Sequence, residues 1–508
     1  MSQPVAPPVA PPIAPPVPPP VPPPESPGRL LLRIDHRIAI RRGEMAEPAW
    51  QHLQAWATEK LTFVNPVYWE ARNHRRPCKH LAKQFVLYHQ EEAELTLPRG
   101  VGGDLRKWLK SQWPELEVEV DDQRSHPALE TPWTLQAELR DYQQAAVDRA
   151  VKMRDGVVVS PTGSGKTVMA MGLLARLATP ALLLVHNRLL VDQIREAAER
   201  FLGVEAGVIG AGQFEVRPLT VATVQTLMRR DLSDLKQLFG VVVLDEAHHC
   251  PAPTFTEVVE QFAARWRLGL TATPERKDGL HPLMHAALGP ELMRMQPREL
   301  LAVGSLSASR VTPVHTTFAG GRMDDHAEMM GKLAGHAQRN QEILRVVLST
   351  CGQRSLVLVE RVEHCQVLAE LLRDAGLRAW GLTGSVATAQ RQEVLAQLKG
   401  PQGGILVATS SLVGEGFDCP ALDTLYLAVP SANVTRVTQA LGRVLRPYDG
   451  KIQARVYDFV DIDTPGLART WAARLRVYRT HGARCDLAVA VADIARVELP
   501  LTAIRAAL

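Results

Sequence analysis

Short apolar runs alternate with longer amphipathic stretches over most of the chain. From Trp133 onward, GVVVSP, ALLLVHN, LTVATV, VVVLDE and RLGLTAT each end in a polar loop, and helical stretches lie between them. A second series follows, with SLVLVE, RAWGLTG, GILVATS, TLYLAV and RVYDFVD. Aliphatic runs of this kind, joined by helices, are typical of buried strands in doubly wound parallel sheets. The pattern therefore predicts an α/β fold with two parallel-sheet lobes.

The region before these lobes has a different pattern. LLLRIDHRIAI predicts a pair of strands, and AWQHLQAWATEKL predicts an amphipathic helix. LTLPRGVGGDLRKWLKSQWPELEVEV predicts a strand, a Gly-rich turn, a helix and a strand. We therefore expect a small α+β domain here. Near the other end of the chain, GLARTWAARLRVYRTHG predicts a helix with one apolar stripe, for which docking on a core is the default interpretation. The stripe consists of Leu467, Trp471, Leu475 and Tyr478.

Proline dominates the first 28 residues. Because proline fixes φ and has no amide hydrogen, this head is expected to be polyproline II or disordered. A spacer is the simpler interpretation, and a docking peptide for a protein partner with an aromatic-lined groove is the alternative. The predicted division of the chain is a Pro-rich head (1–28), a DNA-binding domain (29–125), a first lobe (126–310), a second lobe (311–462) and a helical extension (463–508).

Composition sets broad limits on the class of protein. The 508 residues suggest three or four domains, since domains commonly have ~100–200 residues. A net charge of +4 is only mildly basic, so any nucleic-acid-binding surface must be local. No apolar run reaches the ~18–20 residues of a membrane span. The six cysteines form no Cys-x-x-Cys pair, and the first residues do not form a secretion signal, so a cytoplasmic location is expected.

A nucleotide-binding sequence follows the strand GVVV. SPTGSGKT, residues 160–167, precedes the helical run VMAMGLLARL, which gives the strand, loop and helix that a P-loop requires. Its backbone N–H groups and the helix N-terminus favour phosphate oxygens. Lys166 is expected to reach the β- and γ-phosphates, and Thr167 to bind Mg²⁺. The ATP-binding residues predicted from this loop are Pro161, Thr162, Gly163, Ser164, Gly165, Lys166 and Thr167.

An acidic pair ends the later strand VVVL, in the sequence Asp245-Glu246-Ala247-His248. Ligands of α/β folds bind at the carboxyl ends of parallel strands, and two adjacent acids are costly without a divalent cation. We expect Asp245 to hold Mg²⁺ and Glu246 to orient and deprotonate the attacking water. His248 is placed to bridge toward the second lobe.

Two arginines of the second lobe complete the predicted catalytic set. They lie in QALGRVLRP, residues 439–447, where Arg443 and Arg446 are close to one helical turn apart and can face the same cleft. A guanidinium group matches phosphate oxygens and stays charged. We predict arginine fingers, which can contribute ~10³–10⁵ in rate; surface ion pairs are the alternative. Gln439, at the start of this segment, is included among the predicted catalytic residues.

These motifs together resemble the superfamily 2 helicases of the DEAH-box type, which have two RecA-like lobes. LRDYQ looks like the adenine-reading motif, and the likeness implies ATP contacts by Arg140 and Gln143. ILVATSSLVGEGFDCPALDTL looks like motif V, in which Gly416 and Asp418 approach the nucleotide. The resemblance extends over residues 139–447 and implies an ATP-driven motor that uses Mg²⁺.

Within the superfamily, GEGFDCPALDTLYLA, QALGRVLRP and VYDFVDIDTPGL are most similar to the XPB-like and UvsW-like DNA helicases. Members of this group carry a small DNA-binding domain before the motor, where residues 29–125 stand. XPB-type proteins also carry Arg-Glu-Asp shortly after the TAT sequence, and that motif is implicated in strand opening. Here Arg276, Lys277 and Asp278 occupy those positions, so that role is not carried over.

Two sets of residues are expected to contact DNA. The motor motifs imply backbone-tracking contacts, although each of these residues could instead cap an element or close a turn. The sequence ARNHRRPCKHLAKQ adds clustered cations that can neutralise phosphates, with a solvated helix face as the alternative. The predicted contacts are Arg188, Thr223, Thr383, Gly384 and Thr409 from the motor, and Arg72, Arg75, Arg76 and Lys79 from the cluster.

The favoured hypothesis is an ATP-dependent DNA helicase or translocase that unwinds or remodels duplex or branched DNA. The resemblance implies 3′ to 5′ polarity and a role in DNA repair, recombination or defence. An RNA helicase or remodeller is the first alternative, which ATPase stimulation by DNA or by RNA would distinguish. An ATP-switched scaffold in a repair or phage-defence complex, docked through its Pro-rich head, is the second.

Overall fold

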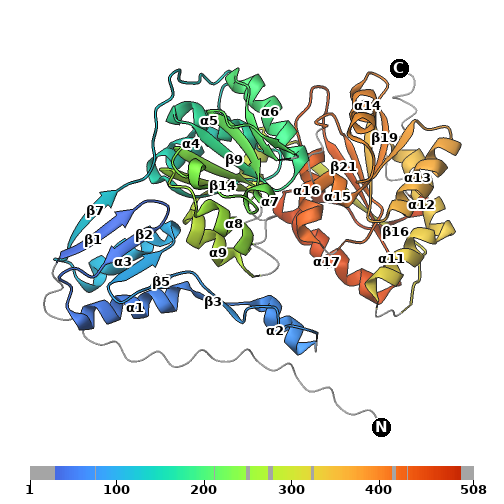
Figure 1. The fold of residues 1–508 in the computed structure, drawn as a ribbon. Helices are drawn as coiled ribbons and strands as arrows, with labels where there is room; N and C mark the ends of the chain where they lie inside the picture. Colours follow the sequence, from blue (N-terminus) through green and yellow to red (C-terminus); the bar gives the residue numbers. More distant parts are fainter. Residues whose placement is uncertain are drawn as a thin grey trace, which may run out of the picture.

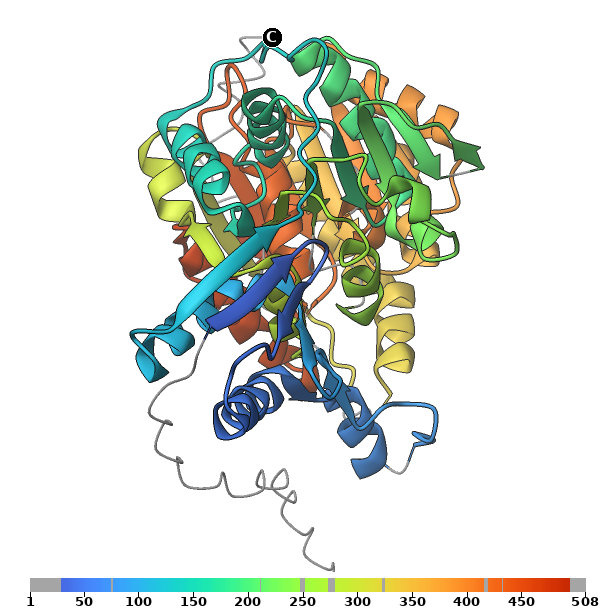
Figure 2. The ribbon, with the colours of Figure 1, turned by 60° about the vertical axis from the view of Figure 1, so that its left-hand side comes forward.

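Three main sheets organise the chain, one for each structured part (Figure 1). In the computed structural model, the first belongs to an N-terminal domain and the other two to lobes that lie side by side. Figure 2 shows the N-terminal domain against the first lobe from a second direction. The structure describes residues 29–74, 76–210, 212–246, 252–272, 279–321, 325–414, 419–431 and 433–493.

The N-terminal domain has a five-stranded sheet in the order β5-β6-β2-β1-β7. The predicted strand pair is confirmed, because β1 and β2 pair in antiparallel fashion with Leu32 opposite Ile40. Trp50 and Leu53 of α1 and Leu105 of α3 are buried in the domain core. The elements are β1 (Arg29–Ile34), β2 (Ile38–Arg41), α1 (Glu47–Leu61), β5 (His89–Gln90), β6 (Glu94–Leu97), η1 (Arg99–Val101), α3 (Gly102–Gln112) and β7 (Glu117–Asp122).

A separate two-stranded hairpin leaves this domain after α1. Strands β3 (Thr62–Val64) and β4 (Gln84–Val86) pair in antiparallel fashion, and helix α2 (Pro66–Asn73) lies in the connection between them. Figure 1 shows α2 projecting away from the five-stranded sheet. We call residues 62–86 the arm.

The first lobe has an eight-stranded sheet in the order β11-β10-β12-β9-β13-β14-β8-β15. Neighbouring strands are parallel except β10 and β11. The strands are β8 (Asp155–Val159), β9 (Ala181–Val185), β10 (Gly207–Gly210), β11 (Gln213–Phe214), β12 (Leu219–Thr223), β13 (Val241–Asp245), β14 (Trp266–Thr271) and β15 (Glu291–Arg294). In β8, β9, β10, β12 and β13, alternate residues face two apolar clusters, one on each side of the sheet.

Helices cover both faces of this sheet. One cluster contains residues of α4, α5 and α6, and the other contains residues of α7, α8 and α9. Strand runs that are apolar on both faces are what burial between two helical layers requires. The helices are α4 (Asp141–Met153), α5 (Lys166–Leu177), α6 (Arg188–Leu202), α7 (Val224–Leu227), α8 (Ala252–Val259) and α9 (His281–Leu288).

The second lobe has another eight-stranded sheet, in the order β18-β19-β17-β20-β21-β16-β22, with β23 also paired to β16. All of its pairings are parallel. The strands are β16 (Ser309–His315), β17 (Arg354–Val359), β18 (Ala379–Leu382), β19 (Gly404–Thr409), β20 (Thr424–Leu427), β21 (Ala454–Val460), β22 (Arg484–Cys485) and β23 (Val489–Ala490). The helices are α10 (Pro297–Ala302), α11 (His326–Gly335), α12 (Ala337–Thr350), α13 (Val362–Asp374), α14 (Thr388–Lys399), α15 (Ser410–Gly414), α16 (Val434–Val444) and α17 (Pro465–Thr480).

The predicted α/β class with two parallel-sheet, RecA-like lobes is confirmed. The second lobe includes residues on both sides of the predicted bounds, 311–462. Leu300 of α10 lies in the core of this lobe, and strands β22 and β23 extend its sheet. Leu467 and Tyr478 of α17 are buried against the same lobe, as the apolar stripe predicts. No helix among the residues that the structure describes is long and apolar enough to cross a membrane.

Candidate nucleotide site between the two lobes

The P-loop lies between the end of β8 and the start of α5, as predicted. Gly163 and Gly165 have φ values of +90° and +83°, which only glycine adopts without strain. A Cβ atom on Gly165 would lie 2.4 Å from Nε2 of Gln143, so the loop also needs glycine for space. Lys166 is the first residue of α5. The loop thus places backbone N–H groups beside the N-terminus of α5, and this arrangement suits a phosphate group.

The first turn of α4 is tied to this loop. The Gln143 side chain donates to the carbonyl oxygen of Ser164 at 2.9 Å and accepts from the backbone N–H of Arg140 at 3.0 Å. The hydroxyl of Tyr142 donates to the same Ser164 oxygen at 2.8 Å. Arg140 and Gln143 therefore lie beside the P-loop, and their contact with the adenine stays a prediction. Tyr142 was missed, although it stands inside the LRDYQ motif.

The acidic pair is brought to the P-loop by the sheet. Strand β13 carries Asp245 at its end and is separated from β8 by one strand. The Lys166 ammonium lies 3.2 Å from Oε1 of Glu246 and 3.4 Å from the carbonyl oxygen of Ser160. The Lys166 side chain therefore bridges the loop and the acid that the sequence predicts as the general base.

Asp245 is buried, and its Oδ1 accepts from the N–H of Glu246 at 3.0 Å. Burial, and then the negative charge of Glu246, raise the pKa of Asp245 to about 7, while Lys166 opposes the shift. Two adjacent carboxylates therefore carry a cost that a nearby cation would remove. Oxygen ligands of this kind are what Mg²⁺ prefers, so the donor set fits the predicted metal.

The second lobe meets the P-loop through α16. A Cβ atom on Gly442 would lie 2.4 Å from Cβ of Thr162, so the helix rests directly on the loop. A Cβ atom on Gly163 would lie 3.5 Å from Cγ of Arg446. Burial lowers the pKa of Arg446. The Cγ atom of Arg446 therefore lies next to the P-loop, whose conformation suits a phosphate group.

Arg443 borders the acidic pair. Burial lowers the pKa of Arg443, and the negative charge of Glu246 opposes that shift. Gln439, one turn earlier on α16, is also buried. An arginine that reaches the acids of the other lobe can stabilise negative charge on a nucleotide between them.

The predicted motor contacts for DNA lie at the carboxyl ends of strands in both lobes. Arg188 is exposed where α6 begins after β9, and Thr223 ends β12. Thr383 follows β18, and Thr409 ends β19. Their three hydroxyl groups are largely buried and lie within hydrogen-bonding distance of Thr226, Ser385 and Ser411. Gly384 is exposed, and a Cβ atom there would meet no atom within 4 Å.

The predicted basic cluster lies on the arm. Arg72, Arg76 and Lys79 are exposed there. Tyr68 is buried, so its ring is not available for stacking on bases. The Arg72 guanidinium lies over the Trp69 ring, 5.2 Å from its centroid. Four predicted site residues lie outside the part of the chain that the structure describes, namely Arg75, His248, Gly416 and Asp418.

The sequence matches two family models. The model described as "Type III restriction enzyme, res subunit" matches residues 136–276, and "Helicase conserved C-terminal domain" matches residues 338–448. Each match lies in one of the two lobes, and together they contain the P-loop, the acidic pair and α16.

Named relatives are similar over the same lobes. A "DNA 3'-5' translocase XPB2" of Sulfurisphaera tokodaii is 34% identical over 197 residues, which are 39% of this chain and 44% of that protein. A "DNA 3'-5' helicase XPB" of Kineococcus radiotolerans is 28% identical over 392 residues, which are 73% of this chain and 68% of that protein. The chain thus spans less than half of the first relative and about two thirds of the second.

Solved structures show the same fold. A variant of S. cerevisiae Dbp5 bound to RNA and ADP BeF3 superimposes with a TM-score of 0.51 and 17% identity, covering 70% of this chain and 91% of that chain. Four findings support the same assignment. They are the two RecA-like lobes, the P-loop with its acidic pair, the arginines from the second lobe and the two family matches. The chain carries the two lobes and motifs of a superfamily 2 helicase, is similar to XPB-type helicases, and is an ATP-dependent helicase.

Proposed function

We propose that this helicase is a DNA-dependent motor that moves 3′ to 5′ and unwinds or remodels duplex or branched DNA. The observation that carries the motor part is the contact of α16 with the P-loop, because it joins the two lobes at the nucleotide site. The names of the XPB relatives support DNA as the substrate and the 3′ to 5′ direction. DNA repair, recombination or defence is the proposed setting, in the cytoplasm.

In this proposal, the residues of the first lobe bind the nucleotide and activate the attacking water. The P-loop residues 161–165 hold phosphate oxygens by their backbone, and Lys166 leaves Glu246 to bind the β- and γ-phosphates. Glu246 then orients the attacking water and accepts its proton. Mg²⁺ held by Thr167 and Asp245 would neutralise phosphate charge. Arg140 and Gln143 contact the adenine.

The residues of the second lobe complete the site. Arg443 and Arg446 stabilise the charge that develops on the transferred phosphoryl group, and Gln439 supports them from the same helix. We also propose nucleotide contacts for Gly416 and Asp418, and a bridging role for His248. The sequence Asp-Glu-Ala-His at residues 245–248 supports assignment to the DEAH subtype.

The proposed DNA path crosses the carboxyl edges of both sheets. Arg188 and Thr223 would contact the backbone from the first lobe, and Thr383, Gly384 and Thr409 from the second. When the lobes close, two such sets of contacts move relative to one another, which produces a step along the strand. We propose residues 29–125 as a DNA-binding domain and the Pro-rich head as the docking site for a protein partner.

The test is an ATPase titration with single-stranded, duplex and forked DNA and with RNA, followed by unwinding of forks with 3′ and 5′ tails. We expect DNA to stimulate hydrolysis more than RNA, and unwinding to require a 3′ tail. Stimulation by RNA alone would indicate an RNA remodeller. Stimulated hydrolysis without unwinding or translocation would indicate an ATP-switched scaffold.

A further inference from the structure

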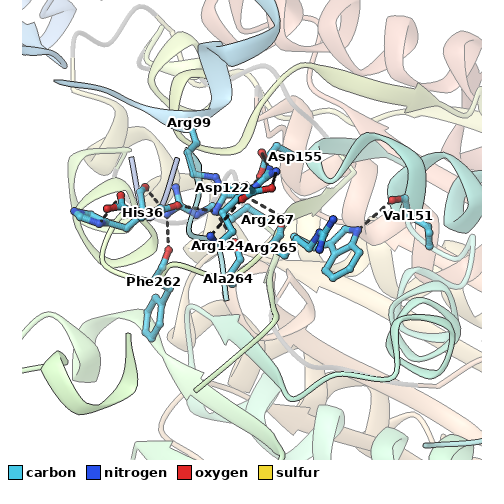
Figure 3. Close-up of polar contacts among 12 residues, drawn as sticks. His36, Arg99, Asp122, Arg124, Val151, Asp155, Phe262, Ala264, Arg265 and Arg267 are labelled. Carbon is cyan, nitrogen blue, oxygen red and sulfur yellow. Dashed lines mark hydrogen bonds and ion pairs between the residues drawn. The ribbon is translucent and has the colours of Figure 1, made fainter. Parts of the chain in front are cut away.

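The N-terminal domain is fixed to the first lobe by buried arginines (Figure 3). Arg99 of η1 is buried and lies 2.6 Å from Oδ1 of Asp155, the first residue of β8. It also donates to the carbonyl oxygen of Arg265 at 3.1 Å. Arg267 of β14 donates to the carbonyl oxygen of His36, in the N-terminal domain, at 2.5 Å. These contacts join the domain to β8 and β14, which are adjacent strands of the first-lobe sheet.

The neighbouring surfaces are close packed. A Cβ atom on Gly100 would lie 2.3 Å from the carbonyl oxygen of His285 in α9. Arg37 pairs with Glu260 at 2.7 Å. Contacts this tight leave no room for sliding, because packed interiors do not deform continuously. The domain therefore moves with the first lobe as one body.

The arm has an inner face and an outer face. Phe63 is opposite Phe85 in the antiparallel pair, so the two side chains lie on the same face. Both rings pack against the apolar cluster of the first lobe that contains α7, α8 and α9. A Cβ atom on Gly279 of that lobe would lie 3.4 Å from Cγ of Pro66. The inner face is therefore anchored on the motor.

The outer face is exposed and mixed, because Val64 lies opposite Gln84 and Val86 lies opposite Thr62. Val64 and Val86 belong to the other set of alternate residues, and their exposed fractions are 61% and 49%. Val67, at the start of α2, is 42% exposed. Asn65 holds this geometry, because its buried side chain donates to the carbonyl oxygen of Ala82 at 2.7 Å and so ties the two ends of the α2 connection together.

The same arm carries exposed cations. The arm contains one acidic residue, Glu70, and several basic ones. None of the following side chains forms an ion pair with another residue in the described part of the chain: Arg72, Arg76, Lys79 and Lys83. Positive charge without ion-pair partners, on an arm that also exposes apolar side chains, matches a ligand that is both polyanionic and apolar. A duplex end, with its phosphates and its exposed terminal base pair, has this chemistry.

We propose that the arm is the strand-separating wedge of this helicase. Its outer face contacts the terminal base pair at a branch point, and its cations hold the phosphates of the flanking duplex. Because the inner face is anchored on the first lobe, closure of the second lobe pulls one strand past a fixed obstacle. The inference rests on the proposed function, since it requires DNA as the substrate.

The test compares two arm variants with matched controls. Val64→Ser/Val86→Ser removes the two valines of the outer face and leaves Phe63 and Phe85 in place. Its control is Val118→Ser/Val120→Ser, at two exposed valines of β7. The expected result for the arm variant is a loss of about tenfold in base pairs opened per ATP hydrolysed on forked DNA. Hydrolysis stimulated by single-stranded DNA should stay at the parent level in both variants.

The charge variant is Arg72→Glu/Arg76→Glu, and its control is Lys152→Glu/Lys236→Glu, at two exposed lysines of the first lobe outside residues 29–125. Losing two phosphate contacts should reduce the slope of log affinity against log salt by about 2 for forked DNA. The control should keep the parent slope. If both arm variants open forks and bind them as their controls do, the wedge assignment is wrong while the motor assignment stands. If no DNA stimulates the parent ATPase, the proposed function fails instead.

Discussion

Glu246 adopts a backbone conformation that few side chains tolerate. Its φ is +47°, in the left-handed region, which costs a non-glycine residue about 1–2 kcal/mol. Its carboxylate meets Lys166 at 3.2 Å, next to the buried Asp245. Strained residues that are held by their surroundings often occur at functional sites, and here the strain directs the acid toward the P-loop.

The first prediction concerns Glu246 and Lys166. Glu246→Gln should bind ATP at least as well as the parent, because Lys166 loses its ion-pair partner and is free for phosphate. Turnover should fall by about 10²–10⁴, since an amide cannot accept the proton of water. Lys166→Ala should instead weaken ATP binding. Nucleotide titration and phosphate release measure the two effects. If Glu246→Gln hydrolysed ATP at the parent rate, Glu246 would not be the residue that accepts the proton of the attacking water.

The second prediction concerns a buried histidine in α13. His364 lies 3.0 Å from Oδ1 of Asn340, and burial, with a smaller effect of Arg339, lowers its pKa to about 3. Between pH 3 and 6.5 the unfolded chain therefore binds a proton that the folded chain does not. The stabilisation is complete above pH 6.5 and is lost as the pH falls. At pH 5.5 the loss from this group is about 1.4 kcal/mol.

His364→Gln should remove that part of the pH dependence. Urea unfolding of parent and variant at pH 7.5 and pH 5.5 gives the four free energies needed. The variant should lose about 1.4 kcal/mol less than the parent over this interval. Equal losses in both proteins would show that His364 is protonated in the folded state.

At the scale of elements, helix α16 and the P-loop belong to different lobes but share one contact. Gly442 faces Thr162 so closely that a Cβ atom added to Gly442 would lie 2.4 Å from Cβ of Thr162 and overlap it. Neither element creates this contact by itself, because each folds on its own sheet. The contact sets how near Arg443 and Arg446 come to the loop. Small changes in this distance should therefore change the rate of ATP hydrolysis more than the stability of the fold.

The third prediction tests this contact. Gly442→Ala should leave α16 intact, since alanine is a better helix former than glycine by ~0.8–1.0 kcal/mol. The added methyl group should separate the lobes and lower DNA-stimulated turnover by about 10²-fold. Gly466→Ala in α17 is the matched control, because a Cβ atom there meets nothing within 4 Å. Similar turnover numbers for the two variants would mean that the contact does not set the rate.

At the scale of the whole molecule, the chain consists of two moving bodies rather than three. Arg99 and Asp155 join the N-terminal domain to β8, the strand whose other end enters the P-loop. Burial lowers the pKa of Arg99, with the charge of Asp155 opposing the shift. A buried charge of this kind needs its partner, because removing one member leaves the other uncompensated.

The fourth prediction is that Asp155→Asn destabilises the unit formed by the N-terminal domain and the first lobe by about 3 kcal/mol. Glu119→Gln is the control, since its pair with Arg29 is exposed at both side chains and should contribute at most about 1 kcal/mol. Urea midpoints of both variants give the comparison. Limited proteolysis between the domain and the lobe should accelerate only in Asp155→Asn. A loss no larger than that of the control would argue against a structural clamp.

The sequence by itself determined the parts that depend on neighbours along the chain. The apolar runs predicted the strands of both lobes, because a strand buried on both faces needs continuous apolar residues. The glycines and Lys166 predicted the P-loop, because phosphate chemistry restricts residue type at each position. The acids 245 and 246, and the two arginines of α16, followed from the same local logic.

Only the tertiary structure decided what depends on residues far apart in the chain. The burial of Arg99 beside Asp155, the approach of Gly442 to Thr162 and the bond from Tyr142 to Ser164 each join separate segments. No local pattern encodes such pairs, since each partner looks ordinary in its own segment. The same holds for the arm. Alternation distinguishes its two faces, but only packing on the first lobe shows which face is buried and which remains free to meet a ligand.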